Sequence, residues 1–256
     1  MIYLYGLAET GTSVAKTALD GTMGLQSTVE VSPLGPWALI HSAQDDAEIL
    51  PRRKLMLAHT RVLERLLPIA PVLPARFGLV AASLDEATDL ITSQHDKIAS
   101  AFDRIRGCVE LGVRVSFDRS KALEATLEQK SALRKERDTL SLRGAEARFA
   151  VADFGGRLAE QLDRRRGDAQ RTLLDALKPL ARDHVLRAPD SDAQALRAEF
   201  LVDADNQETF TTALQKTAAA LPFAPHAEPE IQIIGPAPFY NFVQLYLSPP
   251  QEEEAA

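Results

Sequence analysis

Short runs of alternating apolar and polar residues at the start of the chain are typical of β-strands. An aromatic and aliphatic run covers Ile2–Leu7 and is followed by a Gly/Thr/Ser stretch, which predicts a strand leading into a polar loop. Apolar and polar residues alternate in Ser27–Ser32, which predicts a second strand. The turn-forming residues Pro33–Pro36 separate this segment from Trp37–His41, so the two segments are predicted to pair as a hairpin.

A helical spacing of apolar residues then replaces the alternation. The segment Arg52–Leu67 carries apolar side chains three and four residues apart, with Arg and Glu between them, and is predicted to be an amphipathic helix. The next segment, Val72–Val80, is predicted to be extended and broken by a proline. A second helix is predicted over Ser83–Ile105, because a glutamate three residues after the first serine forms a capping box.

The second half of the chain begins with the clearest strand pattern. Strict alternation in Val109–Phe117 predicts a strand with one buried and one polar face. A long helical region, Lys121–Ala181, follows and is interrupted only by glycines. Two strands, a helix and a last strand come next, at His184–Ala188, Glu199–Val202, Gln207–Leu221 and Glu230–Ile234. This βαββαβ order is typical of a ferredoxin-like sandwich, here with an enlarged first helical connection.

The fold class predicted from these elements is α+β, with two domains. Residues 1–106 would form an N-terminal α+β domain, and residues 107–243 a ferredoxin-like domain containing the long helices 121–181. No Pro/Gly/Ser linker marks the boundary, and the strand Val109–Phe117 could belong to either domain. Residues 244–256, which include Glu252–Glu254, are expected to form a polar acidic tail.

Composition narrows the class of protein without naming an activity. The 256 residues are 45% hydrophobic and 25% charged, and the formal net charge of −7 argues against general binding to nucleic acid or anionic membranes. Residues 119–183 are an exception to the acidic balance, since 15 Lys and Arg stand there against 11 Asp and Glu. Cys108 is the single cysteine, and the sequence has no signal peptide and no membrane-spanning apolar run, so we expect a cytoplasmic protein.

The sequence contains no motif for a known chemistry. Thr10–Thr17 matches the end of a phosphate-binding loop but lacks both glycines, so a polar loop is the better interpretation. The five histidines have no metal-ligand spacing, and neither a nucleophile elbow nor a carboxylate pair occurs. We therefore expect no catalytic residue, cofactor, metal or small-molecule substrate. His59 is interpreted as a partly buried hydrogen-bonding residue, Cys108 as a small buried hydrophobe, and Arg164–Arg166 as the solvated face of a helix.

The most distinctive feature of the chain is a set of segments in a fixed order. These are YLYG at Tyr3–Gly6, AHTRVLE at Ala58–Glu64, VLPARFG at Val72–Gly78, GCVELGV at Gly107–Val113 and GPAPFYNFV at Gly235–Val243. Together they resemble the gas vesicle protein F/L family (GvpF/GvpL), and the resemblance covers nearly the whole chain. Ala75 departs from the family pattern, which has a larger apolar residue there, and Ala237 and Phe239 replace a Trp and a Pro.

The resemblance implies a function in building the gas vesicle, the gas-filled protein shell that gives cells buoyancy. It implies a cytoplasmic accessory protein, associated with the vesicle, that binds the small hydrophobic shell subunit GvpA during vesicle nucleation. Association with other accessory proteins is implied too, as is a place as a minor vesicle component. A two-domain α+β fold with a ferredoxin-like C-terminal part is also implied, in agreement with the element order.

A partner for a hydrophobic subunit must offer an apolar groove or an open sheet edge with a charged rim. The candidate protein-binding residues of the N-terminal domain are Tyr3, Tyr5, Trp37, Arg76 and Phe77. Core packing is the competing interpretation for each of these. The long helices 121–181 would present a second, partly basic surface to other accessory proteins. The alternative function is an enzyme with a site assembled around His59 and Arg76, which a polar pocket holding both side chains would favour.

Overall fold

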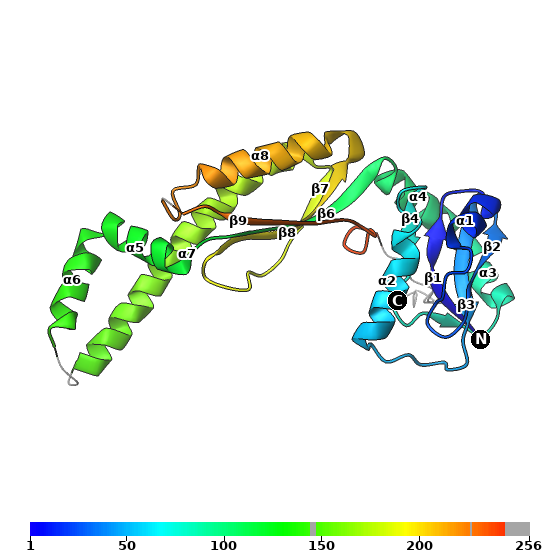
Figure 1. The fold of residues 1–256 in the computed structure, drawn as a ribbon, viewed down its shortest axis with the longest axis horizontal. Coiled ribbons are helices and arrows are strands. Elements are labelled where there is room, and N and C mark those ends of the chain that lie inside the picture. Colours follow the sequence, from blue (N-terminus) through cyan, green and yellow to red (C-terminus); the bar gives the residue numbers. More distant parts are fainter. Residues whose placement is uncertain (144–146, 226, 244–256) are drawn as a thin grey trace, which may run out of the picture. The chain divides into compact units, whose positions relative to one another are not determined.

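The computed structural model describes residues 1–143, 147–225 and 227–243, so the expected acidic tail lies outside the described residues. The chain divides into two compact units (Figure 1). The first unit comprises residues 1–110 together with the segment that starts at Pro236, and the second comprises residues 111–235. The end of the described chain therefore packs with its beginning. A division into domains at residue 106 stays a prediction.

A five-stranded antiparallel sheet forms the centre of the first unit. Its strands are β1 (Ile2–Ala8), β2 (Val29–Leu34), β3 (Trp37–Ala43), β4 (Val72–Pro74) and β5 (Val80–Ala81). The order is β2-β3-β1-β4, and β5 pairs with β1 beside β4. The β2–β3 hairpin predicted from the sequence is confirmed, and Leu34 faces Trp37 across its two-residue turn.

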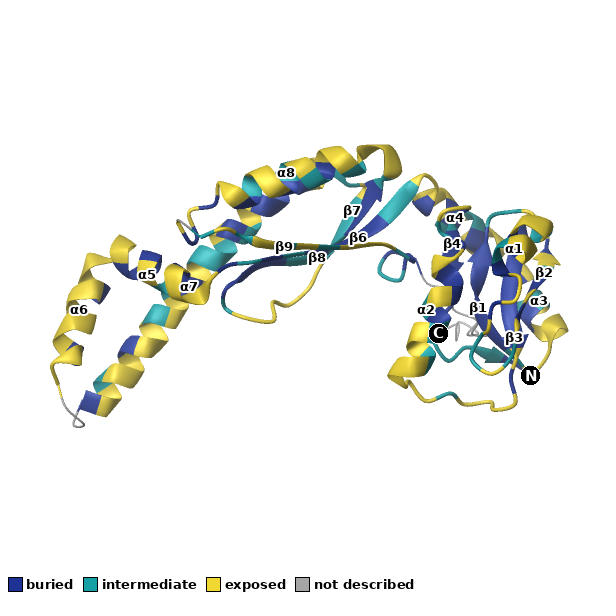
Figure 2. Cartoon of the chain, viewed as in Figure 1, coloured by how far each residue is buried: buried dark blue, intermediate teal, exposed yellow. Residues whose placement is uncertain are grey.

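Helices cover both faces of this sheet. Ala15 and Leu19 of α1 (Thr12–Leu19) and Val62 and Leu63 of α2 (Arg53–Glu64) share one buried cluster with side chains of β1, β2 and β3. Two more helices follow in the chain, α3 (Leu84–Thr92) and α4 (His95–Ile105), and α4 packs against the opposite face of the sheet. Figure 2 shows the buried strands between exposed outer helix surfaces.

Two sequence predictions for these helices were wrong. The stretch after β1 is helix α1 and not a polar loop, because Ala15 and Leu19, four residues apart, give an otherwise polar segment one buried side. The helix predicted over Ser83–Ile105 is two helices separated at Ser93 and Gln94. The Ser93 hydroxyl donates to the Leu90 carbonyl at 2.7 Å and competes with the helical backbone pattern there. The predicted N-cap is confirmed, since the Ser83 hydroxyl accepts from the Glu86 backbone N–H at 3.1 Å.

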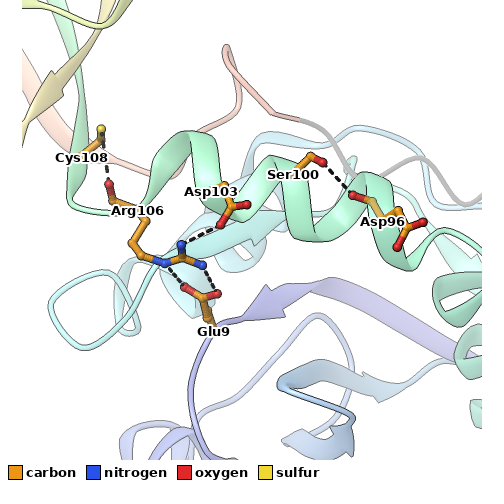
Figure 3. Close-up of polar contacts among 6 residues, drawn as sticks. All are labelled: Glu9, Asp96, Ser100, Asp103, Arg106 and Cys108. Atoms are coloured by element: carbon orange, nitrogen blue, oxygen red, sulfur yellow. Dashed lines mark hydrogen bonds and ion pairs between the residues drawn. The ribbon is translucent and has the colours of Figure 1, made fainter.

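Arg106 joins the end of α4 to the residue that follows β1 (Figure 3). Its Nε and Nη2 donate to the Glu9 carboxylate at 2.9 and 2.5 Å, and its Nη1 donates to Asp103 at 2.7 Å. These carboxylates, Glu9 foremost, raise the pKa of the guanidinium above its usual range. Cys108 begins the next strand and is half-buried, not the fully buried hydrophobe expected. Its thiol lies 3.9 Å from the carbonyl oxygens of Arg104 and Arg106.

The second sheet has the predicted ferredoxin-like topology. Its strands are β6 (Cys108–Ser116), β7 (Asp183–Leu186), β8 (Gln194–Asp203) and β9 (Glu230–Ala237). They lie in the order β7-β8-β6-β9, so the first and third strands of the βαββαβ unit are central, as in a ferredoxin-like sandwich. Helix α8 (Gln207–Ala219) and a short 3₁₀ helix, Ala204–Asn206, connect β8 to β9.

The β6 residues depart from the predicted pattern at three positions. Val109 was expected to be buried and is half-buried, and Gly112 of the expected polar face is buried. Glu110 was assigned to a polar face, but it is only 2% exposed. Its carboxyl group accepts hydrogen bonds from the backbone N–H and the side chain of Asn241, which explains how this polar group can be buried.

The predicted long helical region consists of α5 (Arg119–Gln129), α6 (Ser131–Ser141), α7 (Arg148–Leu177) and a 3₁₀ turn, Lys178–Leu180. The break at Lys130 has no glycine or proline to mark it, and this residue leaves the helical conformation with φ −119° and ψ 83°. The turn lets α6 fold back along α7, where leucines from both sides of the break pack with Phe154. Gly155, Gly156 and Gly167 lie within α7 and do not interrupt it. None of the described helices is long and apolar enough to cross a membrane.

Arg165 of α7 is a structural residue and not part of a solvated charge run. Its Nη1 donates to the Ala122 carbonyl at 2.9 Å and to the Thr126 hydroxyl at 2.6 Å. Its Nη2 donates to the carbonyls of Pro222 and Phe223 at 2.7 and 2.8 Å. Burial lowers the pKa of the guanidinium. The four acceptors replace by hydrogen bonding the hydration that the guanidinium loses. The prediction that all of Arg164–Arg166 faces solvent was therefore wrong at Arg165, and the side chain of Arg166 is only 16% exposed.

Candidate functional site

The first unit contains an apolar cavity beside α2. Its volume is about 250 Å³, and its lining residues are Met56, His59, Thr60, Pro74, Ala75, Arg76, Phe77 and Tyr240. We call it the α2 cavity. Pockets that bury a drug-sized ligand or cofactor usually measure about 300–1,000 Å³. The α2 cavity is therefore closer in size to a site for part of a ligand, such as a single side chain.

Helix α2 forms one wall because its residues have helical spacing. Met56, His59 and Thr60 are separated by three and four residues, which places them along one side of the helix. Val62 and Leu63 lie on the adjoining side and are fully buried in the core. The core thus fixes the rotation of α2 and with it the side that faces the cavity.

The opposite wall is the chain that leaves β4. Gly6 of β1 permits this arrangement, since a Cβ atom at residue 6 would lie 2.3 Å from the Leu73 carbonyl oxygen. The Ala75 backbone N–H then donates to the Tyr5 carbonyl at 2.8 Å. The family resemblance predicts a larger apolar residue at position 75. The short side chain of Ala75 leaves room in the cavity.

Aromatic rings pack beneath and around the cavity. The His59 ring stacks on Tyr5 with centroids 5.5 Å apart, and it meets Phe77 edge-on at 5.9 Å. Tyr3 contacts Tyr5 at 4.9 Å and Phe77 at 6.2 Å, also edge-on. Such pairs add packing energy of about 0.5–1.5 kcal/mol each beyond simple burial. The cluster therefore holds His59 and Phe77 in fixed positions.

Hydrogen bonding determines the proton position on His59. The Gly78 backbone N–H donates to the Tyr3 hydroxyl at 3.3 Å, and this hydroxyl lies 2.7 Å from Nδ1 of His59. Tyr3 can satisfy both contacts by donating its own proton to Nδ1, which assigns the imidazole proton to Nε2. Among the described residues, Nε2 has no hydrogen-bond partner.

Burial keeps this wall of the cavity uncharged at neutral pH. It lowers the pKa of His59 to about 4. Burial also raises the pKa of the Tyr3 phenol above its usual range. The imidazole and the phenol are consequently both neutral around pH 7, a condition that suits an apolar group in the cavity.

The last wall comes from the end of the described chain. Tyr240 lies with its ring centroid 6.2 Å from that of His59, and burial raises the pKa of its phenol to about 12. The neighbouring Asn241 donates from Nδ2 and from its backbone N–H to the Glu110 carboxylate, at 2.6 and 3.3 Å. Phe239 and Phe242 are buried on either side. Sequence reasoning did not propose Tyr240, although its aromatic segment stood out near the end of the chain.

The structure separates the candidate residues into two groups. Tyr3 and Tyr5 are completely buried under the α2 cavity, whereas Arg76 is exposed and Phe77 is partly exposed at its edge. Trp37 lies elsewhere, 4% exposed and stacked on Phe102 of α4 at 5.8 Å. The expectation that His59 is a hydrogen-bonding residue is confirmed, and it is more deeply buried than expected. A role of these residues in binding a partner stays a prediction.

The cavity also bears on the enzyme alternative, because His59 and Arg76 both line it. A histidine that acts as a general base works best with a pKa near the operating pH, and the pKa of His59 is far below it. The only other polar side chains in the lining are Thr60 and Tyr240. No group of three or more His, Cys, Asp or Glu residues that could hold a metal ion occurs in the part of the chain that the structure describes.

Comparison with known proteins gives consistent results. The family described as gas vesicle synthesis protein GvpL/GvpF matches residues 1–244. A gas vesicle protein F from a Streptomyces species is 25% identical over 243 residues, covering 94% of this chain and 99% of the relative. A gas vesicle protein F from a Nostoc species is 24% identical over 214 residues, covering 82% of this chain and 86% of the relative.

Two solved structures share the fold. The crystal structure of GvpF from an Anabaena species superposes with a TM-score of 0.77 at 22% identity, covering 96% of this chain and 98% of that chain. The crystal structure of GvpF from Microcystis aeruginosa gives a TM-score of 0.70 at 23% identity, covering 95% and 99%. These likenesses establish the fold of the chain.

Proposed function

The chain belongs to the GvpL/GvpF family of gas vesicle synthesis proteins, and from this premise we propose that it binds the hydrophobic shell subunit GvpA during vesicle nucleation. Membership gives the protein an accessory role in the gas vesicle, in a family that is structural rather than catalytic. The binding step and its partner are our proposal.

The observation that carries this proposal is the mainly apolar α2 cavity. Its walls are mainly apolar, and Met56 at its edge is 47% exposed, so a partner side chain can enter without displacing the core. A small hydrophobic subunit needs such a site on its carrier, because its apolar surface would otherwise associate with other copies. Burying one large apolar side chain there would contribute about 1.5–3 kcal/mol.

The enzyme alternative draws less support from the same residues. Nδ1 of His59 is engaged by Tyr3, and the low pKa leaves the imidazole neutral and weakly basic. Arg76 is exposed at the edge of an apolar cavity. The other polar side chains of the lining are those of Thr60, Tyr240 and the buried His59. This arrangement suits recognition better than proton transfer.

The long helices 121–181 remain our proposed second surface, for other accessory proteins. Several of their arginines are already paired with neighbouring acids, including Arg157 with Glu136 and Arg166 with Asp163. Recognition there would consequently depend less on charge than the sequence suggests. We also propose that the protein stays on the vesicle as a minor component, which immunodetection on washed vesicles would test.

The direct test is co-purification of the shell subunit with the full chain. We expect the unaltered protein to keep the subunit in solution and to co-purify with it. A Met56→Glu variant, which places a carboxylate at the cavity, should retain less than about a tenth of the subunit. Met23→Glu is the matched control, because Met23 is also an exposed methionine of the first unit but does not line the cavity.

Circular dichroism of both variants would establish that they fold. Loss of capture by Met56→Glu alone would support the α2 cavity as the binding site. If the folded full chain never captures the subunit, the proposal of direct binding is wrong. If Met56→Glu captures it as well as Met23→Glu does, the subunit binds elsewhere on the protein.

A further inference from the structure

The segment that forms most of the α2 cavity has a large excess of basic over acidic residues. Residues 52–76 contain six Lys and Arg and a single acid, Glu64, in a protein of net charge −7. This imbalance exceeds that of the long helices, where acidic residues are nearly as frequent as basic ones. A local excess of positive charge in an acidic protein attracts a partner of opposite sign.

These basic side chains are exposed, and none forms an ion pair with an acidic residue in the part of the chain that the structure describes. Arg65 donates instead to the Thr22 hydroxyl, at 2.7 Å. Within the described residues, none of the following side chains forms a hydrogen bond or ion pair: Arg52, Arg53, Lys54, Arg61 and Arg76.

Other arginines on the protein behave differently. Arg106, Arg119 and Arg197, for example, pair with Glu9, Asp192 and Asp190. Neighbouring like charges on a helix repel one another and cost stability unless a counter-charge is present. The basic side chains of the α2 segment therefore repel one another. At Arg106, Arg119 and Arg197, ion pairs with acidic residues of the same chain offset such repulsion.

Helix geometry aligns the unpaired charges with exposed apolar side chains. Arg53, Leu57 and Arg61 follow one another at four-residue spacing, and Met56 lies three residues after Arg53. Leu57 and Met56 are 45% and 47% exposed. Arg76 lines the α2 cavity from the opposite wall. Cations therefore accompany the apolar surface on both sides of the cavity.

We infer that this face binds an acidic protein segment that inserts one apolar side chain into the α2 cavity and places carboxylates against Arg53, Arg61 and Arg76. The inference rests on the proposed function for the identity of the partner, and it specifies the chemistry by which that partner is recognised. The cavity provides apolar contact, and the surrounding cations determine which apolar segments are accepted.

The cavity is the reason to favour a protein segment over other anions. Phosphate groups of a lipid surface or nucleic acid would interact with the same cations, but they carry no apolar group that would fill an apolar cavity of about 250 Å³. A protein segment can present an apolar side chain with carboxylates one helical turn away on either side.

The experiment measures binding of three fluorescent synthetic helical peptides to the full chain. The first has a leucine flanked by glutamates at four-residue spacing, the second has glutamines in place of the glutamates, and the third has alanine in place of the leucine. We expect the first to bind at least about tenfold more tightly than either of the others. Its affinity should also fall at least about tenfold between about 50 mM and about 500 mM NaCl.

Charge reversal on the protein tests the same contacts. Arg61→Glu and Arg76→Glu should each weaken binding of the first peptide at least about tenfold, while Arg164→Glu, an exposed arginine of the second unit, should leave it unchanged. Equal binding of the glutamate and glutamine peptides would overturn the inference. Tighter binding to vesicles of phosphatidylserine, or to single-stranded DNA, than to the first peptide would also overturn it.

The outcomes separate this inference from the proposed function. If the shell subunit co-purifies with the chain but its capture is indifferent to salt, to Arg61→Glu and to Arg76→Glu, the acidic-segment inference is wrong and shell capture stands. If the acidic peptide binds as described and the shell subunit is not captured, the recognition chemistry stands and the proposed partner is wrong.

Discussion

The Tyr3 hydroxyl lies 2.7 Å from Nδ1 of His59, a contact that joins the first strand of the chain to the helix 56 residues later. Both side chains are at most 2% exposed, so neither can replace this partner with bulk water. The contact holds helix α2, which has an excess of basic residues, against the sheet beside the α2 cavity. It also couples the protonation of one histidine to the stability of the first unit.

The stability of the protein should depend on pH through His59. Its pKa is lowered from 6.5 to about 4 in the folded state by burial, so the unfolded state binds more protons between these values. Stability is therefore complete above about pH 6.5 and should decrease by about 3 kcal/mol as the pH falls to about 4. Urea unfolding at several pH values, compared with a His59→Gln variant, measures this contribution.

Burial also lowers the pKa of His41, so the wild-type curve alone does not isolate His59. An NMR titration of the His59 ring in the folded protein provides the second measurement. A folded-state pKa near 6.5 would contradict the prediction, whatever the unfolding curves show.

A methyl group at residue 6 should disturb the cavity wall. In Gly6→Ala the new Cβ would lie 2.3 Å from the Leu73 carbonyl oxygen, so β4 must move away from β1. We expect a loss of about 1–3 kcal/mol in the free energy of unfolding. Gly155→Ala is the control, since a Cβ there meets nothing within 4 Å and α7 should gain about 0.5–1 kcal/mol. Equal effects of the two variants would contradict the packing described for β1 and β4.

Two adjacent arginines of α7 should respond very differently to truncation. Arg165→Ala removes four hydrogen bonds that join α7 to α5 and to Pro222 and Phe223. We expect it to cost about 2–4 kcal/mol of unfolding free energy. Arg164→Ala alters an exposed position and should stay within about 0.5 kcal/mol of the wild type. Thermal and denaturant unfolding would compare the two, and a small effect at Arg165 would be inconsistent with the structure.

The segment that contains Tyr240 should become more mobile when its hydrogen bond to β6 is removed. Asn241→Ala removes the 2.6 Å hydrogen bond to Glu110 and leaves a buried carboxylate short of a donor, at a cost of about 1–3 kcal/mol. Hydrogen exchange over residues 238–243 should then become faster than in wild type. Asn206→Ala, an exposed site beside α8, serves as the comparison and should leave exchange in that segment unchanged.

Local sequence patterns predicted much of the fold. The alternation in Val109–Phe117 and the turn residues Pro33–Pro36 correctly indicated β6 and the β2–β3 hairpin, because both depend on neighbouring residues. The breaks at Ser93 and Lys130 were missed, since neither is marked by glycine or proline. The break at Lys130 is explained by the packing of α6 on α7, which forms only in the folded chain.

The site was less accessible to sequence reasoning. Arg76 and Phe77 were named and do line the cavity, but nothing local distinguishes them from the buried Tyr3 and Tyr5. Tyr240 was missed because its position depends on the return of the chain to the first unit. The unpaired cations of α2 were present in the sequence as a basic stretch. Their lack of partners could be recognised only once the positions of the acidic residues were known.

The return of the chain to its starting unit has a consequence for how the protein is made. Tyr240 and Asn241 are translated after the entire second unit, and the cavity wall they supply is therefore the last part to reach its place. A ribosome-bound chain that has emerged only to residue 110 already has the sheet and α2, but it lacks this wall. If the α2 cavity holds a partner as proposed, binding there can begin only after the whole second unit and Tyr240 have been synthesised.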